Sequence, residues 1–226
     1  MYNMPYDIYD SKELLRLTEI ADYYCALRIV SCTLHAGQRF LWRQKNPPII
    51  HKIGVREIPE LFSAAVKLRN KPLFEDCLII GAGSMIDPLY KYLEDGKVRE
   101  QAKDMHIAVL RNVVETHRFL LLMVNRDVEE GGPGQSEIDE MKVAVNEAAA
   151  ASITHGQLEL PRYYRKLYEW KSTDSHELFG GFLQGLLWNW LTLDKTAKSG
   201  EGEFEDRFLS AEYKGDVPWD TEDTDF

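Results

Sequence analysis

The six histidines of this chain are the residues best suited to hold a metal ion, but their spacing favours no metal site. A helix-borne zinc site needs two histidines four residues apart with a glutamate beside one of them, and no pair here has that spacing. His106 and His117 fall on one predicted helix, where the intervening turns separate them by about 16 Å. One ion cannot bridge that distance, so we predict no metal ligands.

Two further patterns resemble ligand-binding loops without completing them. The run Gly-Ala-Gly-Ser at 81–84 lacks the preceding strand, the third glycine and the Lys-Ser/Thr pair of a phosphate-binding loop, so we interpret it as a turn. Carboxylates gather at 129–140, but a Gly-Gly-Pro run stands where a calcium loop would place its oxygen ligands. No serine lies in a nucleophile elbow, and no cysteine has a histidine at a patterned spacing. We therefore expect no catalytic residue and no cofactor, and we predict that the protein is not an enzyme.

The elements that would position any site are predicted to be helices. Apolar residues recur at spacings of three and four, and no strand-like alternation lasts beyond four residues. We predict an all-α fold, an irregular bundle of short helices around one long helix, followed by an extended acidic tail. The predicted helices cover approximately 10–24, 27–41, 59–68, 72–80, 88–93, 97–127, 137–154, 160–170 and 178–193.

The longest of these helices, predicted over 97–127, carries the clearest burial pattern. Ala102, Met105, Val109 and Val113 are spaced by three or four residues and share one face. The run at 120–124 is apolar on every side of the helix, and a helix of that kind is normally buried all round. We therefore expect the C-terminal end of this helix to lie deep in the core.

Changes of composition divide the chain into five parts. Glycine and proline are concentrated at 129–136, which is the clearest linker signal in the sequence. The predicted parts are a terminal helical pair at 1–45, a helical continuation with the long helix at 46–128, the Gly-rich linker at 129–136, a second helical sub-bundle at 137–198, and an acidic, aromatic tail at 199–226.

The negative charge of the chain is concentrated at its C-terminal end. The whole chain carries a formal net charge of −10, whereas the tail 199–226 holds ten acidic and two basic residues, which leaves −2 for the remainder. Nucleic-acid binding needs a concentrated basic surface that replaces phosphate counterions, so we expect no nucleic-acid partner. The longest uncharged stretch, 178–193, is shorter than a bilayer span, so we expect no membrane partner.

The three cysteines give an expectation about the cellular compartment. Cys25, Cys32 and Cys77 show no paired spacing, so the sequence predicts free thiols in a reducing environment. Cys25 and Cys77 fall in apolar periodic runs, where we expect both thiols to be buried. The N-terminus carries no basic segment followed by an apolar one, so we predict no signal peptide. We expect an intracellular protein, cytoplasmic or nuclear.

Two features indicate contact between protein surfaces. Gly181 and Gly185 lie four residues apart on a predicted helix and would let a second helix approach closely, within this chain or from another. The acidic tail also holds five aromatic residues, more than a purely solvating tail needs. Phe208 and Trp219 could each pack onto the helical body or onto a partner, and both alternatives stay open at this point.

Several stretches resemble one protein family. The stretch 13–27, a leucine-rich turn followed by Ala-Asp-Tyr-Tyr and a leucine two residues further on, resembles the last helical pair of a BTB (POZ) domain. The stretch 64–79 is similar to the helical continuation of fungal BTB-domain proteins. The stretches 202–212 and 217–220 resemble the acidic closing segment of that group. The similar stretches follow one another in the same order over nearly the whole chain.

The resemblance implies a non-enzymatic adaptor that binds other proteins. Such a module acts through self-association or through recruitment to a cullin-type ubiquitin-ligase scaffold, and it implies no catalytic residue. The strand-rich first half of a BTB domain does not precede Met1 in this sequence. We therefore expect Leu14, Leu17 and Tyr24 to form a partly uncovered contact surface, with Phe208 and Trp219 as further contact residues.

An alternative from a different class is a small-molecule enzyme with an all-α pocket around Tyr163, Tyr164 and Trp170. Such an enzyme needs a concave site with convergent polar groups. A histidine hydrogen-bonded to a carboxylate in the largest pocket would favour this alternative over the adaptor.

Overall fold

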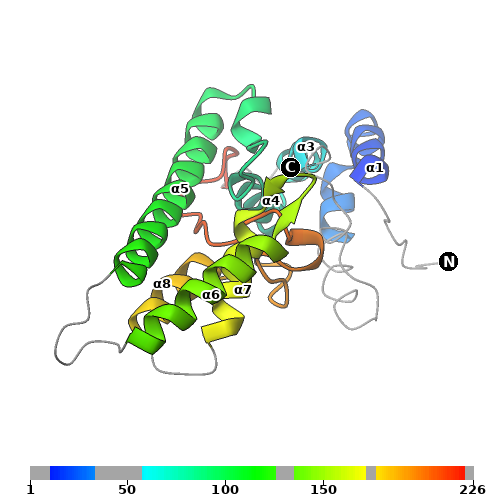
Figure 1. Ribbon diagram of the computed structural model, residues 1–226. Helices are drawn as coiled ribbons and strands as arrows, with labels where there is room; N and C mark the ends of the chain where they lie inside the picture. Colours follow the sequence, from blue (N-terminus) through cyan, green and yellow to red (C-terminus); the bar gives the residue numbers. More distant parts are fainter. Residues whose placement is uncertain (1–10, 34–57, 126–134, 172–176, 222–226) are drawn as a thin grey trace.

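A computed structural model describes residues 11–33, 58–125, 135–171 and 177–221 of the chain (Figure 1). Within these ranges the fold is almost entirely helical, and the sheet is a hairpin of two short strands. The predicted all-α bundle around one long helix is therefore confirmed. The elements are α1 (Ser11–Tyr23), α3 (Ile58–Lys67), α4 (Lys71–Ala82), the 3-10 helix η3 (Leu89–Tyr92), α5 (Gly96–Val124), α6 (Gln135–Ala151), β1 (Ile153–Thr154), β2 (Gln157–Leu158), α7 (Leu160–Lys171), α8 (Glu177–Leu186) and the 3-10 helix η4 (Gly202–Phe204).

The long helix α5 runs along one side of the molecule (Figure 1). It has 29 residues, which corresponds to a length of about 43 Å. It begins where the Asp95 side chain accepts a hydrogen bond from the backbone N–H of Val98 at 2.9 Å, an N-cap that satisfies one free amide of the first turn. It ends at Val124, where the N–H of Asn125 still bonds to the carbonyl of Leu121.

Helix α4 forms the centre of the first part of the molecule. Its N-cap is Asn70, whose side chain accepts from the N–H of Leu73 at 3.1 Å, and a proline occupies its first turn, which needs no amide donor. Nine of its twelve residues are buried, so α3, α5 and η3 surround it. His106 of α5 joins the two helices through its Nδ1, which lies 2.8 Å from the carbonyl oxygen of Ala82.

A tight hairpin reverses the chain between α6 and α7. Ile153 pairs with Leu158, and Thr154 with Gln157. The two turn residues, His155 and Gly156, both have positive φ, at 50° and 78°, as a two-residue type I′ turn requires. The helix predicted as far as 154 therefore ends at Ala151, and α7 returns beside α6.

Helix α8 is shorter than its sequence predicts. In the segment after it, side chains form hydrogen bonds to the backbone in place of the hydrogen bonds of a continued helix. We expected a helix over 178–193, but α8 ends at Leu186 and the following segment is irregular. Asn189 accepts from the N–H of Leu191 and donates to the carbonyl oxygens of Asp194 and Ala197. These bonds satisfy backbone groups that a continued helix would have paired internally.

The buried carboxyl of Asp76 on α4 holds the same irregular segment in place. Its two oxygens accept from the backbone N–H groups of Thr192 at 2.6 Å and Leu193 at 2.8 Å. Burial raises the pKa of Asp76 from 3.8 to about 7, although the two hydrogen bonds oppose that rise. One side chain thus connects α4 to the segment that follows α8.

The C-terminal segment crosses the end of α4 at close range. The N–H of Phe208 donates to the carbonyl of Gly83 at 3.1 Å, and a side chain at position 83 would collide with the backbone of Phe208. The prediction of a simple turn at 81–84 is therefore wrong, since Gly81 and Ala82 form the last turn of α4. A glycine is needed at 83 because a second backbone passes there.

Candidate functional site

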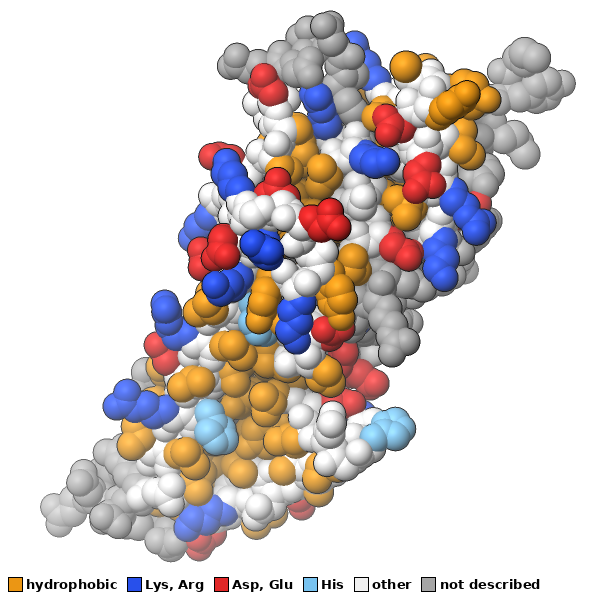
Figure 2. Space-filling model, turned by 90° about the horizontal axis from the view of Figure 1, so that it is seen from above, with side chains coloured by type: hydrophobic (Ala, Val, Ile, Leu, Met, Phe, Trp, Pro, Cys, Tyr) orange, Lys and Arg blue, Asp and Glu red, His pale blue; other side chains and the backbone are white. Residues whose placement is uncertain are grey.

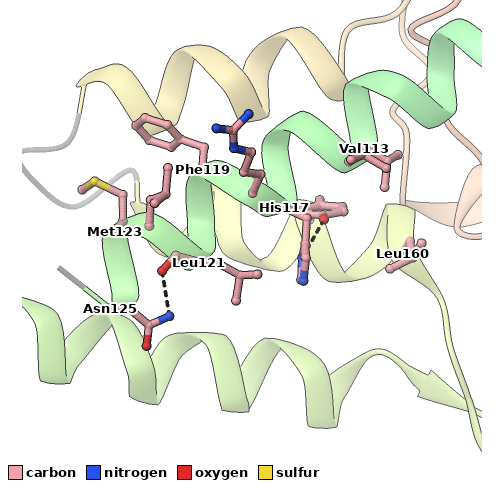
Figure 3. Close-up of a pocket in the computed structure, with 11 residues that line it drawn as sticks. Val113, His117, Phe119, Leu121, Met123, Asn125 and Leu160 are labelled. Carbon is pink, nitrogen blue, oxygen red and sulfur yellow. Dashed lines mark hydrogen bonds between the residues drawn. The ribbon is translucent and has the colours of Figure 1, made fainter.

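An open groove of about 990 Å³ lies between the second half of α5 and the start of α7. Val113, His117 and Leu121 line it from α5, and Leu160 and Tyr164 line it from α7. Figure 3 shows His117 and Leu121 projecting from the side of α5 that faces α6. Hydrophobic side chains gather in one broad area of the face that Figure 2 views. The other lining residues are Val114, Arg118, Phe119, Leu122, Met123 and Asn125.

The C-terminal end of α5 is not buried as its composition predicts. Leu120 is 2% exposed, but Leu121 and Leu122 are 49% and 61% exposed, and Val114 is 65% exposed. Successive helical residues point in directions about 100° apart, so neighbours packed on one side cannot cover a run that is apolar all round. The expectation of deep burial over 120–124 is therefore wrong.

The exposed apolar residues of α5 form a regular stripe. Ile107, Leu110, Val114 and Leu121 are all at least 40% exposed, and His117 fills the remaining position of a spacing that alternates three and four. This is the spacing of a coiled-coil seam. We call these five residues the bare stripe, and it extends over about 21 Å of helix. The covered stripe, on the buried side of α5, consists of Val98, Ala102, Met105, Val109, Val113, Thr116 and Leu120.

One polar contact crosses the floor of the groove. The hydroxyl of Tyr164 lies 3.2 Å from Nδ1 of His117 (Figure 3). Burial raises the pKa of Tyr164 above its usual value, so the phenol stays protonated at neutral pH and can donate to the imidazole nitrogen. Tyr163 is buried and Trp170 is half-buried against the core, so neither lines the groove as Tyr164 does.

The groove does not meet the condition set for the enzyme alternative. A histidine hydrogen-bonded to a carboxylate in the largest pocket would have favoured that alternative. Among the described lining residues there is no aspartate or glutamate, and the partner of His117 is a phenol.

A smaller hollow of about 470 Å³ lies on another side of α5, against α8. Gly181 and Gly185 line it, and a methyl group added to either would meet no other atom within 4 Å. The two glycines therefore do not serve a close helix contact among the described residues. Beside the hollow, Phe119 stacks on Phe182 with ring centroids 4.6 Å apart, which fixes α8 to α5.

The contact residues predicted in the N-terminal pair divide between core and surface. Leu14 is buried, because α1 packs on α3 through the face that carries it, so the expectation of an uncovered Leu14 is wrong. Leu17 is half-buried against the same core. Tyr24 is exposed and its ring lies edge-on to that of Tyr23, with centroids 5.0 Å apart. Asp10, the predicted cap of this helix, lies outside the described residues.

The contact residues predicted in the tail pack within the molecule. Phe208 is fully buried, so it is not available to a partner. Trp219 is half-buried, and its ring meets that of Phe74 edge-on with centroids 5.3 Å apart. Of the two alternatives left open by the sequence, packing onto the helical body is the one observed for both residues.

The cysteines are free thiols, but only one of them is buried. Cys77 lies in the core as predicted, whereas Cys25 and Cys32 are exposed. The expectation for Cys25 is wrong because the chain turns there: its φ of 51° lies in the left-handed region, between α1 and the helical residues 27–33.

Two observations concern ligands and membranes, and both apply only to the described ranges. No group of three or more His, Cys, Asp or Glu side chains there is placed to hold a metal ion. No helix in these ranges combines the length and the apolar composition needed to cross a membrane.

Comparison with known proteins identifies no relative: no family model, no curated protein and no solved structure matches the chain. The resemblance to BTB-domain proteins, the adaptor role and the partners that it implies therefore stay predictions.

Proposed function

We propose that this protein is a non-enzymatic interaction module that binds an amphipathic helix of another protein along the groove of α5 and α7. The observation that carries the proposal is the bare stripe, whose four apolar side chains stay at least 40% exposed at the spacing of a coiled-coil seam. Apolar side chains at this spacing are the anchors used when one protein holds a helix of another in a groove.

The composition of the groove favours a helical peptide over a small polar substrate. Leu121, Leu122 and Val114 offer apolar surface that a monomeric soluble protein rarely leaves in one patch. The polar contact between Tyr164 and His117 lies at the floor, where it would be covered by the partner. Covering this contact keeps the Tyr164–His117 hydrogen bond, while the second ring nitrogen of His117 needs a polar group on the partner helix.

The resemblance of 13–27 to the end of a BTB domain supports an adaptor role of BTB type for this module. Self-association and a ubiquitin-ligase scaffold are the two partner classes that the resemblance implies. Neither class determines which side chains make the contact. The residues that line the groove are the contact residues that we propose.

The test uses the full chain and a defined probe. A fluorescent 21-residue peptide with leucine at every a and d position and glutamine or alanine elsewhere is titrated by fluorescence anisotropy, at nanomolar peptide. We expect saturable binding, weakened at least about tenfold when Val114→Asp and Leu121→Asp are introduced together. Circular dichroism checks that the variant remains folded.

The matched control carries Ile20→Asp and Tyr24→Asp, which also remove two exposed apolar side chains, one on α1 and one directly after it. The control should bind the peptide as the wild type does. The proposal is wrong if the wild type binds no peptide, or if the two double variants weaken binding equally.

A further inference from the structure

We infer that the helix bound by the bare stripe is acidic, and that its carboxylates pair with Arg111 and Arg118 of α5. This inference rests on the proposed function and names the chemistry of its partner. It follows from where the two arginines lie relative to the stripe and from what surrounds them.

Both arginines flank the bare stripe on the same side. When Ile107 is taken as position a of a heptad, the stripe fills positions a and d. Arg111 and Arg118 each follow a d residue directly and so take position e, seven residues or about 10.5 Å apart. Side chains at e and g border a coiled-coil seam and select its partner by charge.

The two arginines have no acidic partner within the described part of the chain. Both are exposed, and no ion pair or side-chain hydrogen bond of either is observed there. Glu115 lies on the same helix within i,i+4 reach of both, yet forms no ion pair with either. Within those ranges no carboxylate is paired with either guanidinium group, so both can meet carboxylates that arrive with a partner.

The other flank of the stripe carries no charge that could reverse this preference. Its g positions hold Val113 and Leu120, which are buried and lead into the groove. Among the described residues that line the groove, Arg118 is the only aspartate, glutamate, lysine or arginine. A partner helix therefore meets apolar surface on one flank and two cations on the other.

A second copy of this chain does not supply the missing carboxylates through the same stripe. If two α5 helices packed antiparallel, their e positions would face each other and arginine would meet arginine. If they packed parallel, each e position would face a g position, which is Val113 or Leu120 here. Like charges therefore oppose the antiparallel pair, and the parallel pair offers no carboxylate to either arginine.

The net charge of −10 does not cancel this local preference. The described acidic segment after η4 lies beside the first half of α5, where Tyr213 contacts Gln101 at 3.4 Å. Gln101 is ten residues before Arg111, about 15 Å along the helix. Exposed charges farther apart than about 8–10 Å are largely screened at physiological salt.

The experiment compares three peptides of equal length and identical leucine seams, with glutamate, lysine or glutamine at the e and g positions. Placing the same residue at both flanks makes the result independent of helix direction. At low salt we expect the acidic peptide to bind about tenfold more tightly than the basic one. Added salt should shrink this difference.

The variant Arg111→Gln with Arg118→Gln should reduce the difference between the acidic and basic peptides to less than about threefold. Its control, Lys97→Gln with Arg99→Gln, removes the same net charge from exposed positions at the start of α5 and should leave the difference unchanged. Binding to vesicles of phosphatidylserine and phosphatidylcholine is measured for the same proteins.

The outcomes separate the inference from the proposed function. Equal binding of all three peptides contradicts the acidic partner and leaves the helix-binding function in place. If no peptide binds, both fail. Vesicle binding that the Arg111→Gln and Arg118→Gln variant abolishes, without preference among peptides, would assign the arginines to an anionic membrane surface and overturn the inference.

Discussion

The two apolar stripes of α5 have the same residue types and nearly the same spacing, yet opposite surroundings. The covered stripe lies against the core, and Leu120 at its end is 2% exposed. The bare stripe borders the open groove, and the next residue, Leu121, is 49% exposed. The difference shows that periodicity identifies a surface able to pack, while the position of the neighbouring helices decides whether it does.

The largest effect expected from this comparison is a difference in stability between adjacent leucines. Leu120→Ala should lower the free energy of unfolding by about 2–5 kcal/mol, because it leaves a cavity in the core. Leu121→Ala should cost less than about 1 kcal/mol, because its side chain is already half in water. Urea denaturation of both variants measures the difference. Equal losses would mean that the bare stripe is buried too.

A second prediction concerns how stability depends on pH. It rests on Asp76 of α4, the helix that packs against the covered side of α5. Its pKa is about 7 in the folded protein and 3.8 when unfolded, so the folded state binds more protons between these values. The contribution of Asp76 to stability should therefore be fully present below about pH 4 and fall by up to about 4 kcal/mol as the pH rises to about 7.

The control for this prediction is Asp76→Asn, which cannot titrate. Asparagine offers one acceptor oxygen where the carboxyl offers two, so the variant loses one bond to Thr192 or Leu193 at every pH. The unfolding free energy of both proteins is measured across this range, and the slope is compared. Parallel profiles would show that Asp76 does not titrate there.

A smaller effect is expected at Tyr164, on the floor of the groove between the two stripes. Tyr164→Phe keeps the buried ring and removes only the hydroxyl that meets His117, so it should cost about 0.5–1.5 kcal/mol. A double-mutant cycle with His117→Phe measures the coupling. Strictly additive losses would mean that the two side chains do not interact.

The smallest expected effect is a gain in stability, from a substitution on α8 beside the hollow that this helix forms with α5. Gly181→Ala adds a methyl group that meets no atom within 4 Å, so only helix propensity should change. We expect about 0.5–1 kcal/mol of added stability in thermal unfolding. A loss instead would indicate that α8 packs more closely on α5 than described.

Local signals in the sequence were sufficient to place several helices. The predicted helices 97–127 and 160–170 correspond closely to α5 and α7, because capping residues and apolar spacing act within a few turns. Helix α8 was predicted too long, because the bonds that end it come from Asn189 and from Asp76, more than a hundred residues away. No local pattern contains a contact of that kind.

The groove could not be predicted, although part of its pattern is visible in the sequence. Ile107, Leu110 and Val114 repeat the coiled-coil spacing on a side of α5 about a third of a turn away from the recognised apolar face, with Arg111 and Arg118 beside them. A second apolar stripe bordered by arginines is a signal for an exposed seam. The positions of α4 and α7 decide which of the two stripes is buried. These positions depend on contacts between distant parts of the chain, which no local pattern shows.

The most direct test of the account is the solvent accessibility of methyl groups along α5. Methyl-labelled protein is mixed with a soluble paramagnetic chelate, and the relaxation of each leucine, isoleucine and valine methyl is measured by NMR. We expect strong broadening for Val114, Leu121 and Leu122 and protection for Val109 and Leu120. Equal protection of all five would contradict the central claim that the second half of α5 presents a bare apolar stripe.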